Sequence, residues 1–178
     1  MDPIIYSICQ KPVIGMVMWL TSLCVFPPLF SDEPIELSVK DSSTTKIFKV
    51  PVDKKYQLTV SFEFESIQKR LEDQIVGKTG DCSNVIYEEI SESSRKDYGR
   101  PIPFKVVVRR ADDRAIVLDK EFVSLCVAYH DLKTIKGRTI GWIELPRGKY
   151  VAEVTNLVAQ SGLKNTKTKV SLGAGHGK

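Results

Sequence analysis

The sequence has few of the side chains from which most catalytic and metal sites are built. Only two histidines occur in 178 residues, His130 and His176. The chain contains no Gly-x-Ser-x-Gly elbow, no His-Glu-x-x-His helix and no complete phosphate-binding glycine loop. His130 precedes Asp131, but adjacent residues of a strand point to opposite faces. We therefore predict that the protein is not an enzyme and that it holds neither a metal nor a cofactor.

An excess of charge of one sign is also missing. Lysine and arginine together number 26 and aspartate and glutamate 22, for a formal net charge of +4. Nucleic-acid binders usually cluster basic residues with aromatic residues between them. Here the basic residues alternate with acidic ones, which is typical of a solvated mixed surface. We expect no nucleic-acid partner.

One long stretch lacks charge altogether. Residues 12–31 read PVIGMVMWLTSLCVFPPLFS, and Asp32 and Glu33 follow at once. Pro27 and Pro28 would break a helix, which favours a cleaved signal peptide over a membrane span. Ser31 is small enough to precede the cleaved bond.

Two alternatives remain open for this segment: an uncleaved membrane anchor, and a lipoprotein signal acylated at Cys24, for which Leu23 is bulky. We predict a signal peptide or anchor over residues 1–31 and one domain over 32–178. The chain would then work in the periplasm or cell envelope, in contact with the membrane only through its N-terminal segment.

Cysteine is scarce once the leader is set aside. Cys9 and Cys24 lie in the leader, which leaves Cys82 and Cys126. In an oxidising compartment this pair would form a disulfide, with a stabilisation of about 4 kcal/mol from the closed loop. The alternative is two buried free thiols.

The periodicity of residues 32–178 is that of β-strands. In Tyr56–Phe64, apolar and polar residues alternate, so that one face covers a core. Asp112 and Asp113 predict a hairpin turn, and Leu145–Tyr150 resembles the tyrosine corner of Greek-key sandwiches. The predicted strands are 35–39, 47–52, 56–64, 102–109, 115–118, 121–128, 138–145, 150–156 and 166–172.

A single segment has helical spacing. Ile67, Leu71 and Ile75 recur every four residues within 66–76, and Glu65 or Ser66 could cap that helix. Residues 78–99 are polar and irregular and are predicted to be a long loop or a disordered segment. The sequence thus predicts an all-β, antiparallel β-sandwich of the immunoglobulin-like or jelly-roll-like Greek-key type, with one short inserted helix.

Binding is better supported than catalysis. The predicted loop and its end carry Tyr87, Arg95, Tyr98 and Arg100, residue types that are enriched at protein interfaces. Trp142 has two interpretations, a core residue of a central strand, which we favour, or an exposed platform for a sugar ring or a partner. These five residues are our candidate binding residues.

The chain resembles a known family in Ile47–Phe64, the short helix, Pro101–Val108 and, above all, Arg138–Tyr150. That family consists of small exported bacterial proteins, often lipoproteins, with a domain of unknown function. The motifs are structural, so the resemblance implies a fold and an exported location and assigns no catalytic residue.

Our leading hypothesis is an exported, non-enzymatic β-sandwich that binds another protein in the bacterial cell envelope. One form of it is an immunity protein that neutralises a delivered effector toxin. The alternative is a module that binds envelope polysaccharide or a small ligand through Trp142. An envelope enzyme would require His130 and an acid to converge in a pocket.

Overall fold

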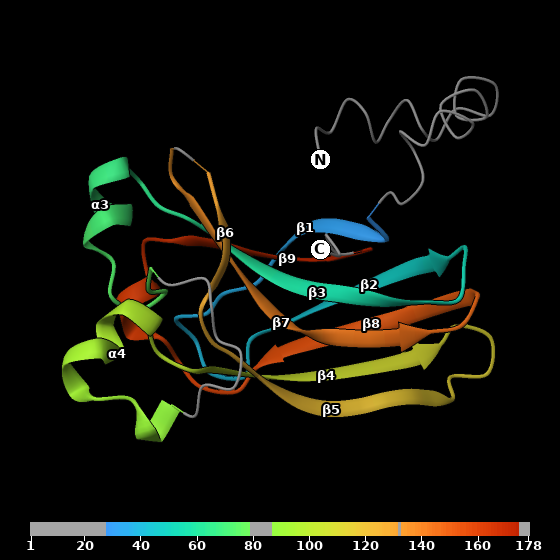
Figure 1. The fold of residues 1–178 in the computed structure, drawn as a ribbon. Coiled ribbons are helices and arrows are strands. Elements are labelled where there is room, and N and C mark those ends of the chain that lie inside the picture. Colours follow the sequence, from blue (N-terminus) through green and yellow to red (C-terminus); the bar gives the residue numbers. More distant parts are fainter. Residues whose placement is uncertain (1–27, 79–86, 132, 175–178) are drawn as a thin grey trace.

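A computed structural model describes residues 28–78, 87–131 and 133–174, and these form a two-layer antiparallel β-sandwich (Figure 1). One sheet has the strand order β1-β9-β3-β7-β6 and the other β2-β8-β4-β5. The strands are β1 (Phe30–Pro34), β2 (Ser43–Val50), β3 (Lys54–Glu63), β4 (Ile102–Arg110), β5 (Ile116–Ser124), β6 (Val127–His130), β7 (Ile135–Leu145), β8 (Gly148–Asn156) and β9 (Lys167–Gly173). The predicted all-β sandwich is confirmed.

The core lies between the two sheets because each strand turns alternate residues inward. In β3 the inward residues are the apolar members of the predicted alternation, and all of them are buried. They meet the inward residues of β4 and β8 from the opposite sheet in one continuous cluster. Burying such side chains is worth about 1.5 to 3 kcal/mol each before the loss of chain entropy is counted. The period-2 pattern therefore places the core correctly.

Two tyrosine corners hold the turns at one end of the sandwich. The Tyr150 hydroxyl donates to the Pro146 carbonyl at 2.9 Å, which confirms the predicted corner. A second corner was not predicted: the Tyr56 hydroxyl donates to the Val52 carbonyl at 2.7 Å. Each tyrosine lies four residues after its acceptor, so the ring bridges the turn and the first residues of the next strand.

The turn between β4 and β5 also has the predicted chemistry. The Asp113 side chain accepts from the Ala115 backbone N–H at 2.9 Å, and Asp112 accepts from the Asp113 N–H at 2.9 Å. Arg110 donates to Asp113 at 2.6 Å. These carboxylates satisfy turn amides that no strand partner can reach.

Two local predictions were wrong because tertiary contacts override local pattern. Residues 35–39 form a turn instead of a strand; its Leu37 and Val39 carbonyls accept from the Asn156 side chain at 3.1 and 2.9 Å. The predicted strands 115–118 and 121–128 are divided differently, into β5 and β6 of opposite sheets. The chain crosses between them at Cys126, whose φ of 62° makes the bend.

The helical segment differs from prediction as well. Helix α3 is shorter, at Ile67–Glu72, with Ser66 as its confirmed N-cap. The 78–99 segment is not a plain loop, because it contains a 3-10 helix η1 (Tyr87–Glu89) and helix α4 (Glu92–Tyr98). A further 3-10 helix, η2 (Ser161–Leu163), precedes β9.

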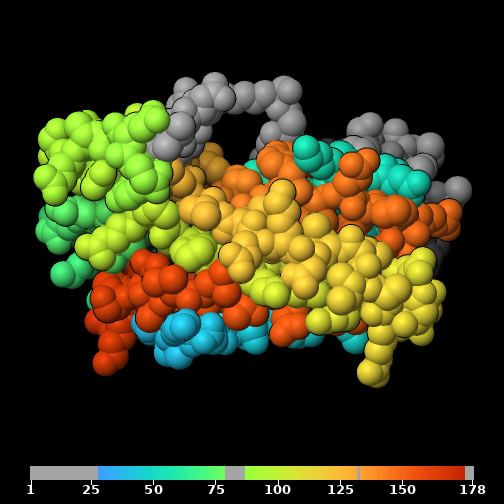
Figure 2. Space-filling view, turned by 90° about the horizontal axis from the view of Figure 1, so that it is seen from below, coloured from blue at the N-terminus to red at the C-terminus, as the bar shows by residue number. Residues whose placement is uncertain are grey.

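Helices α3 and α4 stand together at one end of the sandwich, and the turns β2–β3, β4–β5 and β7–β8 lie at the other (Figure 1). Figure 2 shows the same separation in the space-filling view, with the green helical segments at one end and the yellow β4–β5 turn at the other. No helix within the described ranges is both long and apolar enough to cross a membrane.

The start of the described chain belongs to the sandwich. Phe30, inside the predicted leader, is 4% exposed and pairs with Leu172 of β9. Its ring packs edge-on against Phe48, with centroids 5.5 Å apart. Residues 1–27 of the predicted leader lie outside the described residues, so cleavage after Ser31 stays a prediction. Such cleavage would remove Phe30 from the core.

We predict that each tyrosine corner contributes about 1 kcal/mol to the free energy of unfolding, the usual net value of one hydrogen bond. Tyr56→Phe and Tyr150→Phe should each lose this amount in urea unfolding. Tyr129→Phe, at an exposed tyrosine, is the control and should change stability little. Burial raises the pKa of Tyr56 above its usual 10.0. Its contribution should therefore be full below pH 10 and fall as pH rises further, and a pH-independent difference would contradict this assignment.

Candidate functional site

The most distinctive local structure is the attachment of the helical end to the sandwich. We call residues 65–78 and 87–100 the cap. It contains α3, η1 and α4, and four of the five candidate binding residues. The cap is fastened to the sheet through one strand, β7, which sends two basic side chains inward beneath it.

Arg138 of β7 is the main attachment. Its side chain is fully buried, and the carbonyl groups that it reaches belong to three separate stretches of chain. From the first part of the cap, the Val76 carbonyl accepts from Nε at 2.9 Å and that of Ile75 from Nη2 at 2.8 Å. The Arg100 carbonyl accepts from Nη1 at 2.7 Å and that of Ser124 at 3.2 Å. One guanidinium therefore joins both parts of the cap to the crossover after β5.

Lys136, two residues earlier on the same inward face, makes the second attachment. Its Nζ lies 2.8 Å from Asp73 Oδ2 and 2.7 Å from the Gly77 carbonyl oxygen. The side chains of Lys136 and Asp73 are each 5% exposed, so this ion pair is buried. Asp73 also accepts from the Ile75 and Val76 backbone N–H groups at 3.0 and 3.1 Å. Because its partners are fixed, the pair orients the 73–77 stretch.

Both cations are held in a weakly polar environment. Burial lowers the pKa of Arg138 from its usual value to about 10, while the negative charge of Asp73 opposes the shift. Burial also lowers the pKa of Lys136, and the hydrogen bond that Lys136 donates to Asp73 opposes this shift. A folded pKa below the unfolded value means that keeping the charge costs free energy on folding near pH 7. Hydrogen bonds to carbonyl groups offset that cost for Arg138, which stays protonated at pH 7.

Two glycines allow the cap to approach this arginine. Gly99 has a φ of 78°, and a Cβ there would lie 2.1 Å from Arg138 Nη2 and 2.5 Å from the Ile75 carbonyl oxygen. Gly77 has a φ of 83°, and a Cβ there would lie 2.6 Å from the Gly99 backbone nitrogen. Any side chain at either position would displace the backbone groups that Arg138 binds.

Helix α3 projects from this anchored base with its apolar side outward. None of its residues is buried, and Ile67 and Leu71 are 49% and 53% exposed. Ile75, which the spacing assigned to the same helix, lies beyond it and packs partly against the core. The Arg70 Nε atom donates to the Lys133 carbonyl at 2.8 Å, which ties α3 to the β6–β7 turn. The apolar side that the helical spacing predicted for α3 is therefore not covered by the sandwich.

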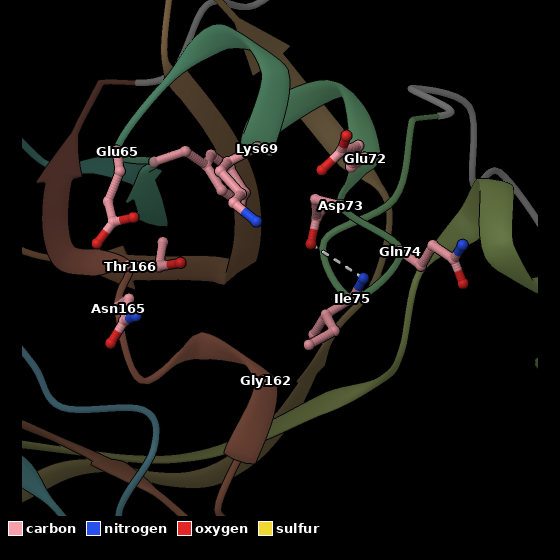
Figure 3. A pocket seen from close by; sticks show the side chains of 10 residues that line it. Glu65, Lys69, Glu72, Asp73, Gln74, Ile75, Gly162, Asn165 and Thr166 are labelled. Atoms are coloured by element: carbon pink, nitrogen blue, oxygen red, sulfur yellow. Dashed lines mark hydrogen bonds between the residues drawn. The ribbon is translucent and has the colours of Figure 1, made fainter.

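A pocket of about 370 Å³ opens between α3 and the η2–β9 connection (Figure 3). Lys69, Glu65 and Thr166 face it from opposite sides, and Gln74 points away. Its lining mixes both signs of charge with Ile75 and Phe64. Asp73 is already bonded to Lys136, so this pocket offers no concentrated charge for a metal or an anion. Within the described ranges no group of three or more histidine, cysteine or acidic side chains could hold a metal.

The structure brings Tyr87, Arg95, Tyr98 and Arg100 together in the cap. The Arg95 guanidinium lies over the Tyr87 ring at 5.3 Å and donates to the Ile90 carbonyl at 3.1 Å. Arg100 has an exposed side chain, whereas its backbone oxygen accepts a hydrogen bond from Arg138. Tyr87, Arg95 and Tyr98 are half-buried. The cap thus combines candidate residues with structural contacts of its own.

Trp142 lies apart from the cap, on the outer face of β7, and the favoured interpretation of a core residue was wrong. It is 41% exposed and pairs with Gln57 of β3. In a regular strand Trp142 would face inward like Arg138 and Ile140. A shift in the β3–β7 register between Leu58 and Thr59 adds a residue to β7 and reverses the direction of the side chains that follow.

The predicted disulfide lies only partly within the described residues. Cys126 is 3% exposed and is not a free thiol, but Cys82 is outside the described residues. The pairing of Cys82 with Cys126 stays a prediction.

His130 and Asp131 do not form a base and its orienter. His130 is exposed at the end of β6, and its Nδ1 lies 3.2 Å from the Asp131 backbone oxygen. The Asp131 carboxylate accepts from the Lys133 and Ile135 backbone N–H groups, at 2.9 and 2.7 Å. Asp131 is therefore a turn residue.

Sequence reasoning missed the residues on which the cap depends. Arg138 and Lys136 looked like surface residues because charged residues are rarely buried. A weak signal existed. Lys136, Arg138 and Ile140 occupy alternate positions of one strand, so their side chains are expected on the same face of the sheet. The acceptors of Arg138 are backbone carbonyl groups, which leave no mark in a sequence, and Asp73, which binds Lys136, lies 63 residues away in the chain.

The comparisons with known proteins agree with this fold and assign no activity. The family model described as a domain of unknown function, DUF5625, matches residues 32–174. The chain is also similar to a protein from Sulfurospirillum deleyianum whose crystal structure is known, with 18% identity and a TM-score of 0.65. The alignment covers 85% of this chain and 99% of that one. No curated protein matches the chain.

We predict that Arg138→Lys destabilises the protein by about 3 kcal/mol, because one ammonium cannot reach the carbonyl groups that the guanidinium satisfies. Arg147→Lys, at an exposed arginine in the β7–β8 turn, is the matched control and should change stability by less than about 0.5 kcal/mol. Urea unfolding measures both. Equal effects of the two substitutions would show that Arg138 does not fasten the cap.

Proposed function

We propose that this chain, which belongs to the DUF5625 family of domains of unknown function, is an exported, non-enzymatic β-sandwich that binds another protein in the bacterial cell envelope. The cap is its binding surface. The observation that carries the proposal is the outward apolar side of α3, because Ile67 and Leu71 remain about half exposed on a helix that buries no residue. A short helix with apolar residues at this spacing fits a groove of a partner.

The fastening of the cap supports this role. A binding surface gains affinity when it is already ordered in the free protein, since less entropy is lost on association. Arg138 and Lys136 supply that order from beneath, through buried hydrogen bonds. Tyr87, Arg95, Tyr98 and Arg100 add the aromatic and guanidinium groups that are enriched at interfaces. We also propose that Cys82 and Cys126 form a disulfide, which would link the chain between α3 and η1 to the crossover after β5.

The immunity function is a specific form of this proposal. An immunity protein needs a rigid surface that covers a toxin and needs no chemistry of its own. Export through residues 1–31, as a signal peptide or an anchor, would place the cap where a toxin delivered into the envelope acts.

We predict that Ile67→Ser/Leu71→Ser abolishes capture of a specific envelope protein in a pull-down with the full chain. Loss of two partly exposed apolar anchors should weaken binding at least tenfold. Val52→Ser/Val158→Ser is the matched control, because these residues are 48% and 49% exposed in connections outside the cap. A captured protein lost from the first variant and kept by the second supports the proposal. Equal capture by both variants, or no capture by the parent, counts against it.

The captured protein also tests the immunity form. Exported alone into the envelope, it should stop growth, and co-export of the parent chain should restore growth while the Ile67→Ser/Leu71→Ser variant should not. A captured protein without toxicity would remove the immunity assignment and leave the binding function.

A second candidate function rests on Trp142. Its exposed indole lies on the outer face of the larger sheet beside Gln57, whose side-chain amide donates to the Thr139 hydroxyl at 2.7 Å. An exposed aromatic ring with neighbouring polar groups can stack on a sugar, so this face would bind envelope polysaccharide or a small ligand.

We predict for this candidate that soluble envelope glycan fragments quench the indole fluorescence of the chain, and that Trp142→Ala raises their dissociation constant about tenfold, the scale of one aromatic contact. Trp19→Phe removes the chain's other tryptophan and should leave glycan affinity unchanged. Quenching that survives in Trp142→Ala would contradict a site at this face.

A further inference from the structure

The end of the sandwich opposite the cap carries an unexplained pair of like charges. Lys49 of β2 lies directly across from Lys149 of β8, and both side chains are exposed. None of the ion pairs among the described residues involves either lysine. Like charges directly opposite on neighbouring strands destabilise a sheet. The fold gains no stability from this pair, which suits the two lysines to binding an anionic ligand.

The surroundings of the two lysines add positive charge and open space. Lys49, Arg147, Gly148 and Lys149 line one hollow, and Arg147 and Lys149 line a second hollow together with Arg110. The acids nearby are bonded within the same turns, and one of them, Asp112, lines the second hollow and accepts from the Asp113 backbone N–H at 2.9 Å. Asp113 binds Arg110, and the Asp53 carboxylate accepts from the Arg147 backbone N–H at 2.5 Å. We call Lys49, Arg147 and Lys149 the basic end.

Exposed apolar side chains lie next to the basic end on the same sheet face. Ile47, two residues before Lys49, is 59% exposed, and Ile116 of β5 is 58% exposed. Strand pairing places them in one row across the sheet, because Ile47 pairs with Val151, Val151 with Arg109, and Arg109 with Ile116. Basic and apolar side chains together suit the boundary between lipid headgroups and acyl chains.

The chain also arrives at this place from its uncharged segment. Pro28, Leu29 and Phe30 line a hollow together with Lys46, Ile47 and Lys49 of β2 and with Pro51, which follows that strand. Glu33 also lines this hollow and forms an ion pair with Lys46, so Lys49 is the cation there without an ion pair among the described residues. Residues 12–27, which immediately precede Pro28, contain no charged side chain. Phe30 belongs to the core, so a chain that keeps its N-terminal segment, as an anchor or through a lipid on Cys24, keeps this hydrophobic contact. The segment and the basic end would then meet the same membrane.

We infer that the basic end and its neighbouring isoleucines form a membrane-docking face that binds anionic phospholipid headgroups, in addition to the N-terminal segment. Lys49, Lys149 and Arg147 contact the phosphate groups, and Ile47 and Ile116 enter the boundary region. The cap, at the opposite end of the sandwich, then points away from the bilayer, where a partner can reach it (Figure 1). This face is supported by the positive charge of Lys49, Arg147 and Lys149 and by the position of Pro28 beside Lys49. The inference is therefore independent of what the cap binds.

The test compares the full chain reconstituted into vesicles of phosphatidylcholine alone and of phosphatidylcholine with phosphatidylglycerol, by hydrogen exchange. We expect amides of 46–52 and 146–151 to exchange about fivefold more slowly in the anionic vesicles, the scale of one lysine attracted to such a surface. High salt should remove the difference. Amides of 66–72 in the cap should exchange equally in both vesicles.

Charge variants decide the outcome. Lys149→Glu should abolish the slowing, and it should fold at least as well as the parent because Lys49 then faces a carboxylate. Lys49→Gln/Lys149→Gln provides a second variant without new charge. Lys96→Glu/Lys164→Glu, at exposed lysines of α4 and of the connection after η2, is the control and should retain the slowing. The inference is overturned if the anionic lipid has no effect on 46–52 and 146–151, or if the effect survives in both Lys149 variants.

Discussion

The arrangement of the cap on the sandwich depends on the hydrogen bonds that the Arg138 guanidinium donates. It lies between the two parts of the cap and the crossover after β5, and it donates to carbonyl groups of all three. Without a donor at that point, several buried carbonyl groups would lack partners, each at a cost of about 1 to 3 kcal/mol. A hydrophobic side chain could fill the space and could not hold these stretches in register. The positive charge is retained at neutral pH because the carbonyl dipoles around it replace part of its lost hydration.

The body of the sandwich and the cap that Arg138 attaches to it have different structural requirements. The sandwich needs its apolar inner faces, its turns and its tyrosine corners, and these account for the body of the fold. The cap needs only a few fixed points, at Arg138, Lys136 and the two close glycines. Between those points some side chains of the cap, such as Ile67 and Leu71, are exposed and contribute little to the packing of the fold. A surface that is fixed from beneath and unconstrained on top is suited to recognition.

The two ends of the sandwich have different chemistry, and we therefore propose a different partner for each end. The cap end offers half-exposed apolar residues with tyrosine and arginine. The opposite end offers Lys49 and Lys149, which form no ion pair with another described residue, beside the point where the described chain enters the sandwich. Attraction to an anionic surface is long-ranged and needs no shape, whereas an apolar groove requires an ordered partner surface. An envelope protein that binds the membrane through its basic end and a partner through its cap would present the cap in a defined direction, away from the membrane.

Much of the fold could be predicted from local pattern. The alternation in Tyr56–Phe64, the Asp112–Asp113 turn and the Tyr150 corner all follow from rules that act over a few residues, and the structure confirms them. Those rules failed where one distant contact decided the outcome. Asn156 turns 35–39 away from a sheet, and a register shift between β3 and β7 exposes Trp142. Part of the candidate site was predicted, since Tyr87, Arg95, Tyr98 and Arg100 lie in the cap. The exposure of Ile67 and Leu71 was not, because helical spacing shows that a helix has an apolar side and says nothing of what covers it.

That the chain forms an antiparallel β-sandwich follows from its sequence, because the period of its apolar residues and the chemistry of its turns are local properties. The inward direction of Arg138 and Lys136, the position of the cap above them and the pairing of Lys49 with Lys149 become visible in the folded chain alone. The physical reason is the same in each case: such contacts join residues far apart in the chain, and their partners are often backbone groups that every residue possesses.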